Sequence, residues 1–235
     1  MVKRLDNKVI DAMTREEFEL EPRLIKRAPD FSKYNLLLVD DDPGIISSVS
    51  SYLALVENLS VLATVSPYIA RELIDSYKKD EVTATPEMIG ARALVAMETA
   101  KTSKKLDERD FQSYTRADLQ LPNGKELAQI YDEGLVLIIS DAKMGGINGF
   151  QLLNYASEKI PNTFRLILSA EIGYAQQKNP EELFSAGAVG YINKGMPDYE
   201  TALVNKIKNV FGQEVLARNL HSFADFYRKH VNKIN

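Results

Sequence analysis

Acidic, hydroxyl and amino side chains follow four short apolar runs of the chain. The runs read YNLLLV (34–39), LVLII (135–139), FRLIL (164–168) and AVGYI (188–192). The polar residues after them are Asp40, Asp41, Asp141, Ser169 and Lys194. Runs this short and this rich in branched residues are typical of strands buried on both faces, as in a parallel sheet. The carboxyl ends of parallel strands lie together on one rim of the sheet, so we expect these side chains to converge there. Ligands bind at this rim in open α/β sheets.

The converging groups favour phosphate chemistry assisted by a metal ion. Three carboxylates held together repel one another, so one would stay protonated unless a cation neutralised the group. Mg²⁺ prefers carboxylate, carbonyl and water oxygens. An aspartate neutralised in this way can attack phosphorus and form an aspartyl phosphate. The new phosphoryl oxygens need positive charge and donors, which Lys194 and Ser169 could provide. A single acidic residue after a strand is usually only a solvated surface side chain. The joint order of these residues, each directly after a buried strand, is a much more specific sign of a functional site.

Composition limits the class of protein. The 235 residues are 45% hydrophobic and 26% charged, as in a soluble globular protein with one large domain or with one domain plus appendages. The net charge of −4 does not suggest a general nucleic-acid binder. The absence of cysteine excludes disulfides and thiolate metal sites. We find no bilayer-spanning stretch and no signal-peptide core, and so expect a cytoplasmic protein without membrane contact.

Helical patterns alternate with the apolar runs. This alternation predicts a doubly wound α/β sheet with right-handed crossovers. A further strand is predicted over residues 59–65. Helices are predicted over 43–56, 68–78, 86–100, 125–133, 151–159, 180–186 and 198–211. Pro43 suits the first helical turn, with Asp42 as its N-cap.

Three segments lie outside the alternation. Residues 1–33 form a charged extension, in which Thr14 and Glu17 make a capping-box pattern and predict a helix over 15–27. Residues 213–235 predict a basic amphipathic tail, which either pairs with another protomer or folds back on its own domain.

The third segment, residues 66–123, fits two registrations. The crossover helix after the second strand is either 68–78, with an insertion after it, or 125–132, with all of 66–123 inserted. We prefer the second, because residues 125–141 run from helix through a tight turn into a strand with no additional loop residues. The helical insertion would then leave the sheet at the rim that carries the polar residues.

Four motifs make the chain similar to the receiver domains of two-component response regulators. VDDDPG (39–44) resembles the acidic loop of that family, and DAKMGGINGF (141–150) resembles its phospho-acceptor loop. LSAE (168–171) resembles the switch loop, and GAVGYINKG (187–195) the lysine loop. The resemblance covers about 34–65 and 124–212. It implies a flavodoxin-like, five-stranded parallel sheet in the order 2-1-3-4-5, with a helical insertion between strands two and three and a C-terminal helical tail.

The resemblance also implies roles for individual residues. Asp141 would accept phosphate from a sensor histidine kinase or a phosphotransfer protein. The ligands of Mg²⁺ would be Asp41, Asp141 and the carbonyl of Lys143, with Asp40 acting through water. Ser169 would bond to the phosphoryl group, Lys194 would pair with it, and Tyr191 would be the aromatic switch. The protein would signal through protein contacts rather than act as an enzyme, and it could form a homodimer through the tail or the insertion.

Two departures from the family pattern keep other interpretations open. Gly145 stands where the family usually has proline, and Gly195 stands where it usually has a cis proline. A cis bond without proline would cost about 3 kcal/mol, so we expect this loop to be trans. A receiver-like binding module that no longer depends on phosphate is therefore one alternative. An aspartyl-phosphate phosphatase is a weaker one, because Lys143 stands where such enzymes generally have a second aspartate.

Overall fold

The computed structural model describes residues 35–57, 59–78, 84–102, 119–122, 124–170 and 186–212. The chain divides into two compact units, one of residues 31–211 and one made of residues 1–30 and 212–235. The helices predicted over 15–27 and 180–186 and the predicted tail over 213–235 lie outside the described residues.

The described strands form one sheet in the order β3-β2-β1-β4-β5-β6. They are β1 (Asn35–Val39), β2 (Ser60–Thr64), β3 (Leu119–Gln120), β4 (Leu135–Asp141), β5 (Phe164–Ser169) and β6 (Gly190–Asn193). Five of them run parallel in the predicted order, which confirms the flavodoxin-like α/β fold. The two-residue β3 pairs antiparallel with β2 and was not predicted.

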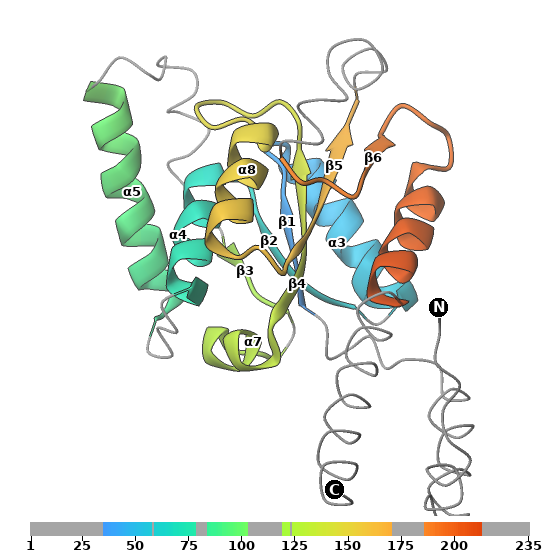
Figure 1. Cartoon of the computed structure of the whole chain (residues 1–235), viewed down its shortest axis with the longest axis horizontal. Coiled ribbons are helices and arrows are strands. Elements are labelled where there is room, and N and C mark those ends of the chain that lie inside the picture. Colours follow the sequence, from blue (N-terminus) through green and yellow to red (C-terminus); the bar gives the residue numbers. More distant parts are fainter. Residues whose placement is uncertain are drawn as a thin grey trace, which may run out of the picture. The chain divides into compact units, whose positions relative to one another are not determined.

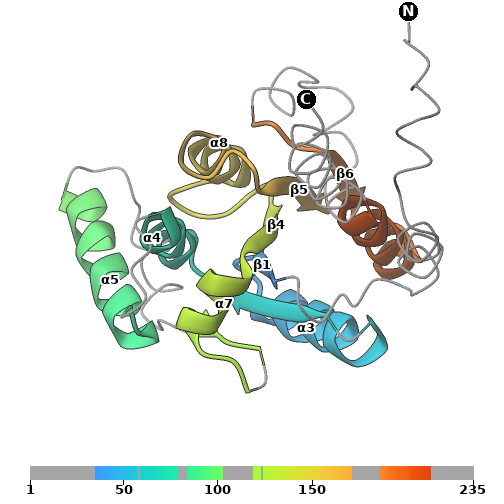
Figure 2. The same cartoon turned by 60° about the horizontal axis from the view of Figure 1, so that its bottom comes forward.

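Helices cover both faces of the sheet (Figures 1 and 2). They are α3 (Pro43–Glu57), α4 (Pro67–Lys78), α5 (Pro86–Thr102), α7 (Leu127–Glu133), α8 (Gly149–Lys159) and an unlabelled helix over residues 199–212. α3 and the helix over 199–212 lie on one face, and α4 and α8 lie on the other. Strands β1, β2 and β4 are buried along their whole length because both faces are covered. No described helix is long and apolar enough to cross a membrane.

α4 is the crossover helix between β2 and β4, and this corrects the preferred registration. Its apolar face, which includes Ile69, Leu73 and Ile74, is buried in the core between the sheet and α8. α4 packs directly against α8 and contacts β1 and β2. The alternative registration, with the crossover helix over 68–78, matches this packing. The additional residues follow Lys78 rather than Val65.

α7 lies at the amino ends of the parallel strands, opposite the polar rim. The side-chain amide of Asn35, at the start of β1, donates to the carbonyls of Ile130 (3.4 Å) and Gly134 (3.2 Å). Lys125 Nζ also lies 2.5 Å from Glu133 Oε2. α5 begins after the far end of α4 and runs alongside it (Figure 1). The expectation that the insertion leaves the sheet at the polar rim is therefore wrong.

Candidate functional site

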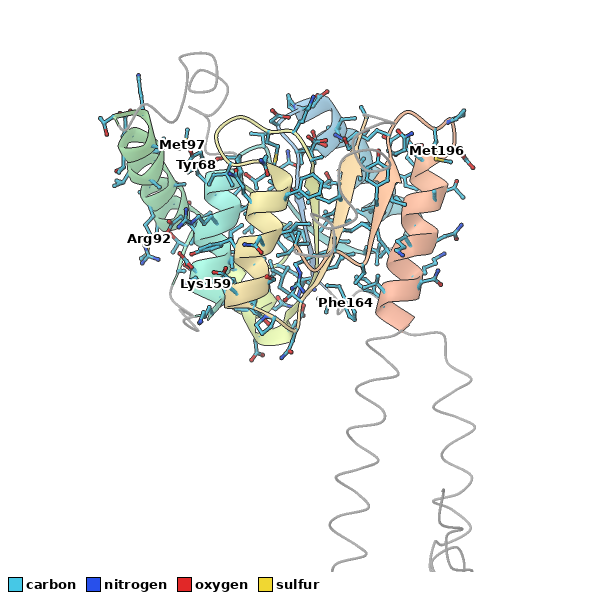
Figure 3. All side chains as sticks on the ribbon, turned by 45° about the horizontal axis from the view of Figure 1, so that its top comes forward. Tyr68, Arg92, Met97, Lys159, Phe164 and Met196 are labelled. Atoms are coloured by element: carbon cyan, nitrogen blue, oxygen red, sulfur yellow. The ribbon has the colours of Figure 1, made fainter. Side chains whose placement is uncertain are left out.

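Three strand ends bring two carboxylates and one ammonium into contact. Asp40 follows β1, Asp141 ends β4, and Lys194 follows β6. Lys194 Nζ lies 2.5 Å from Asp40 Oδ2 and 2.6 Å from Asp141 Oδ1. Figure 3 is turned toward the rim that carries them, with Met196 labelled on the loop that follows Lys194. The amine therefore bridges both acids, although the three residues are far apart in sequence.

Backbone amides hold the other oxygen of each acid. The N–H of Asp42 donates to Asp40 Oδ1 at 3.1 Å, and the N–H of Lys143 donates to Asp141 Oδ2 at 2.7 Å. Asp40 is 1% exposed, and its Oδ2 accepts no well-aligned hydrogen bond although Lys194 is in contact with it. This buried oxygen of Asp40 is therefore held by the ion pair with Lys194 and by no backbone amide.

The start of α3 fixes the acidic loop. Asp42 Oδ1 accepts a hydrogen bond from the N–H of Gly44 at 2.8 Å, and the Asp42 carbonyl accepts one from Ile46 at 3.1 Å. This is the N-cap arrangement expected from the sequence. Asp41 lies between Asp40 and Asp42 and is half-exposed. It is close enough to Asp141 for the two carboxylates to repel each other.

The start of α8 fixes the acceptor loop. The Gly149 N–H donates to the Ala142 carbonyl at 3.1 Å, and a Cβ at Gly149 would lie 2.0 Å from the Asp141 carbonyl oxygen. Asn148 and Gln151 form a reciprocal capping box at the same helix start. Neither the close approach at Gly149 nor the capping box was predicted from the sequence. The Asn148–Gln151 spacing was the signal for the cap, whereas no sequence pattern marks the close approach at Gly149.

The remaining predicted residues lie on the same rim. Ser169 is buried at the end of β5, and its carbonyl accepts a hydrogen bond from the Lys194 N–H at 2.8 Å. The half-buried Tyr191 has its Oη 3.5 Å from the same carbonyl. Lys143 is exposed in the acceptor loop. No peptide bond in the described ranges is cis, so the bond before Gly195 is trans as expected, and Lys194 still reaches both acids.

Burial and like charge set the protonation of the site. Burial raises the pKa of Asp40 to about 6, and the charge of Asp141 adds to this while Lys194 opposes it. Burial and the charge of Asp141 also raise the pKa of Asp41. For Lys194, burial lowers the pKa, but hydrogen bonds and charge from Asp141 and Asp40 outweigh it and leave the pKa above its ordinary value. The site therefore carries more negative charge than its one ammonium balances.

The chemistry of these donors fits Mg²⁺. Three carboxylates share the rim, and the pKa values of two of them, Asp40 and Asp41, are raised. These are the conditions that a hard divalent ion relieves. Across the described ranges, no three acidic or histidine side chains are gathered as around an ion, and Lys194 Nζ stands between Asp40 and Asp141. In this arrangement the amine pairs with two of the three acids and leaves the rim with a net negative charge.

Asp40 should make the protein less stable as the pH rises from about 4 to 6. Its pKa is raised from 3.8 to about 6 on folding, so the folded state binds more protons in this window. The full shift corresponds to about 3 kcal/mol lost above the folded pKa. We expect Asp40→Asn, which stays neutral, to recover about 2 kcal/mol at pH 8 and nothing near pH 4. Urea unfolding across this range measures the difference, and an equal gain at both ends would contradict the assignment.

Comparisons with known proteins give structural matches alone. No protein-family model matches the chain, and no curated protein does. The structure matches response-regulator receiver domains across most of the chain at low sequence identity. A CheY-like receiver domain of Methanospirillum hungatei JF-1 has a TM-score of 0.42 and 19% identity, over 77% of this chain and 96% of its own.

Two further matches come from Vibrio cholerae and Pseudomonas fluorescens. The chemotaxis protein CheY4 of Vibrio cholerae has a TM-score of 0.39 and 19% identity, over 75% of this chain and 98% of its own. The signal receiver domain of an HD domain-containing protein from Pseudomonas fluorescens Pf-5 has a TM-score of 0.46 and 13% identity, over 83% of this chain and 98% of its own.

Proposed function

We propose that this protein is a phospho-accepting receiver, with Asp141 as the acceptor and a histidine kinase or phosphotransfer protein as the donor. The observation that carries the proposal is the placement of Lys194 Nζ between Asp40 Oδ2 and Asp141 Oδ1. A phosphoryl group on Asp141 carries a charge of about −1.5 to −2 where the carboxylate carried −1, and it spreads that charge over three further oxygens. A cation already held 2.6 Å from the acceptor is in position to balance that charge.

The hydrogen bonds of Asp141 favour one of its oxygens as the nucleophile. Oδ2 accepts a hydrogen bond from the Lys143 backbone N–H at 2.7 Å, whereas Oδ1 accepts one at 2.6 Å from the Lys194 ammonium, which can shift to the phosphoryl oxygens. Attack by Oδ1 forms the P–O bond of the acyl phosphate and breaks the P–N bond of a phosphohistidine, whose ring nitrogen keeps the electron pair. Lys194 then moves from the carboxylate to the phosphoryl oxygens. The Ser169 hydroxyl donates to the same oxygens, and Tyr191 responds to the movement of Ser169.

Mg²⁺ would be held by Asp41, Asp141 and the carbonyl of Lys143, with Asp40 acting through water. The ion would supply positive charge to the carboxylates and to the phosphoryl oxygens. Asp41 suits the role of direct ligand because it is half-exposed, whereas Asp40 is buried and anchored by the N–H of Asp42.

Acetyl phosphate and Mg²⁺ should add one phosphoryl group to the full chain, and Asp141→Asn should abolish the addition. The amide is a poor nucleophile, and it retains the shape of the carboxylate. Intact-mass spectrometry measures the product, with Asp132→Asn, at an exposed position of α7, as a matched control that should label normally. Wild-type labelling of Asp141→Asn, or no labelling of the wild type, would overturn the assignment.

The ion pairs also support a second candidate, a receiver-like binding module that does not use phosphate. The Lys194 ammonium contacts both Asp40 and Asp141 and so offsets part of their charge. Titration with Mg²⁺ followed by thermal unfolding separates the two candidates. A phospho-accepting site should gain stability with Mg²⁺, and Asp41→Asn should remove that gain. A phosphate-independent module should show no response in either protein.

A further inference from the structure

A cavity of about 420 Å³ lies among α4, α5, α8 and the acceptor loop. Figure 2 shows α5 outside α4, on the side of the sheet that α8 also covers. Small residues leave the cavity open, because α5 lines it with Ala96 and Ala100 and the acceptor loop lines it with Gly146. Figure 3 labels Met97 of α5 near Tyr68 of α4, which also lines the cavity. The added helix α5 therefore forms one wall of a space large enough for a small organic molecule.

An exposed arginine lines this cavity. Among the described residues of the lining, Arg71 of α4 is the charged one. Its Cζ lies 4.4 Å from the centroid of the Tyr155 ring on α8, and Lys159 Nζ lies 5.3 Å from the same centroid. None of the ion pairs between described residues includes Arg71 or Lys159. The lining therefore offers a positive charge that no carboxylate of the described ranges pairs with.

The one acid in this group of side chains is already bound to the tyrosine. Asp75 Oδ1 accepts a hydrogen bond from the Tyr155 hydroxyl. Across the described part of the chain, the charged side chains in contact with Tyr155 are thus two cations and one carboxylate. A guanidinium carries five N–H donors in a planar fork that matches a carboxylate. Because Arg71 contacts Tyr155 and forms no ion pair there, donors remain for an anion in the cavity.

The other walls of the cavity suit an apolar group. Ala96 and Ala100 line it from α5. Ile147 lines it from the acceptor loop, and Leu152 lines it from α8. Ligand sites typically combine apolar walls of this kind with a few polar groups that fix the orientation of the ligand.

We propose that this cavity is a binding site for a small organic anion, with an apolar ring between α5 and α8 and a carboxylate on the guanidinium of Arg71. The charge-assisted hydrogen bonds to Arg71 select the anion, and the apolar walls select the ring. Binding in the cavity does not require phosphorylation of Asp141. A failed binding test would therefore leave the phospho-acceptor assignment in place.

Titration of the full chain with 2-naphthoate tests the class of ligand. This probe joins a flat apolar ring system to one carboxylate, whereas 2-naphthalenemethanol has the rings without the charge and acetate has the charge without the rings. Calorimetry should give a Kd of about 1 mM or lower for 2-naphthoate. The alcohol should bind at least about tenfold more weakly, and acetate should not bind at the same concentrations. No binding of 2-naphthoate, or equal binding of either control, would overturn the proposal.

Two pairs of variants test the position of the site. Arg71→Gln should weaken 2-naphthoate binding about tenfold, whereas Lys78→Gln, at an exposed position in the last turn of α4, should bind normally. Ala100→Phe should abolish binding because it fills the cavity, whereas Ala91→Phe, at an exposed position of α5, should not. Circular dichroism verifies folding, and the Arg71 pair decides the outcome if Ala100→Phe does not fold. Wild-type affinity in Arg71→Gln, or in folded Ala100→Phe, would exclude this cavity.

Discussion

Replacing Gly149 by alanine should lower the free energy of unfolding by about 3 kcal/mol, at the upper end of overpacking effects. The added Cβ would lie 2.0 Å from the Asp141 carbonyl oxygen and 3.0 Å from Ser140 Oγ, so either α8 or the end of β4 must move. Alanine is the better helix former, so intrinsic propensity favours the variant, and any loss of stability reports the steric conflict. Because the displaced carbonyl belongs to the proposed acceptor, phosphorylation by acetyl phosphate should slow as well.

Gly212→Ala is the matched control for Gly149→Ala. Gly212 lies at the end of the helix over residues 199–212, and a Cβ there has no heavy atom within 4 Å. We expect the stability of this variant to stay within about 0.5 kcal/mol of the wild type. Urea unfolding compares the two substitutions directly. Equal effects would mean that α8 and β4 do not approach each other as closely as the structure shows.

The parallel sheet could be predicted because its strands are buried on both faces. Burial on two sides removes the polar residues from a strand, so YNLLLV and LVLII are recognisable without any knowledge of their neighbours. The same burial explains why the polar rim could be predicted. In a parallel sheet, the first polar residue after each run lies on one edge, and the structure places Asp40, Asp141 and Lys194 there.

The crossover helix was assigned wrongly because two helices fit the local pattern, and the one with the tighter connection to the next strand was preferred. α4 and α7 both precede a turn and both have apolar residues at helical spacing. Only their tertiary contacts distinguish the two helices. α4 is long enough to cross the sheet and pack on α8, whereas α7 is seven residues long and is fastened to the start of β1 by Asn35. β3 escaped prediction for a similar reason, because two residues carry no periodicity.

Contacts within the site were also beyond the sequence. Strand ends place side chains on a rim, but they do not determine which oxygen meets which donor. The bridge from Lys194 to both Asp40 and Asp141 depends on the lysine loop, where Gly195 replaces the usual proline of the resembling family. The need for glycine at position 149 also depends on a tertiary contact, because a Cβ there would clash with the backbone carbonyl of Asp141 at the end of β4.

Replacing Lys194 by methionine should lower the free energy of unfolding by about 3 to 5 kcal/mol at pH 8, as for removal of one partner from a buried ion pair. Methionine resembles the lysine stem in length but carries no charge. Asp40 Oδ2 and Asp141 Oδ1 would then keep their negative charge with no ammonium between them. The Lys194 side chain is 10% exposed, so water cannot readily replace it.

The pH dependence of the Lys194→Met effect identifies its cause. The pKa of Lys194 is raised on folding, so its stabilising contribution is complete below pH 10 and lost as the pH rises through the folded pKa. Between pH 5 and 8 the wild-type amine is therefore constant, and the pH dependence of the difference comes from the carboxylates. Because the pKa of Asp40 is already about 6 with the amine present, protonation should shrink the penalty toward pH 5.

A control and a rescue complete the test of Lys194. Lys208→Met, on the exposed side of the helix over 199–212, should change stability by less than about 0.5 kcal/mol. Mg²⁺ should restore more stability to Lys194→Met than to the wild type, because the variant's carboxylates have no other cation to balance them. A loss of stability in Lys194→Met that is independent of pH and unaffected by Mg²⁺ would mean that Lys194 stabilises the fold through its apolar stem alone. That result would contradict the proposal that the rim carries out phosphate chemistry.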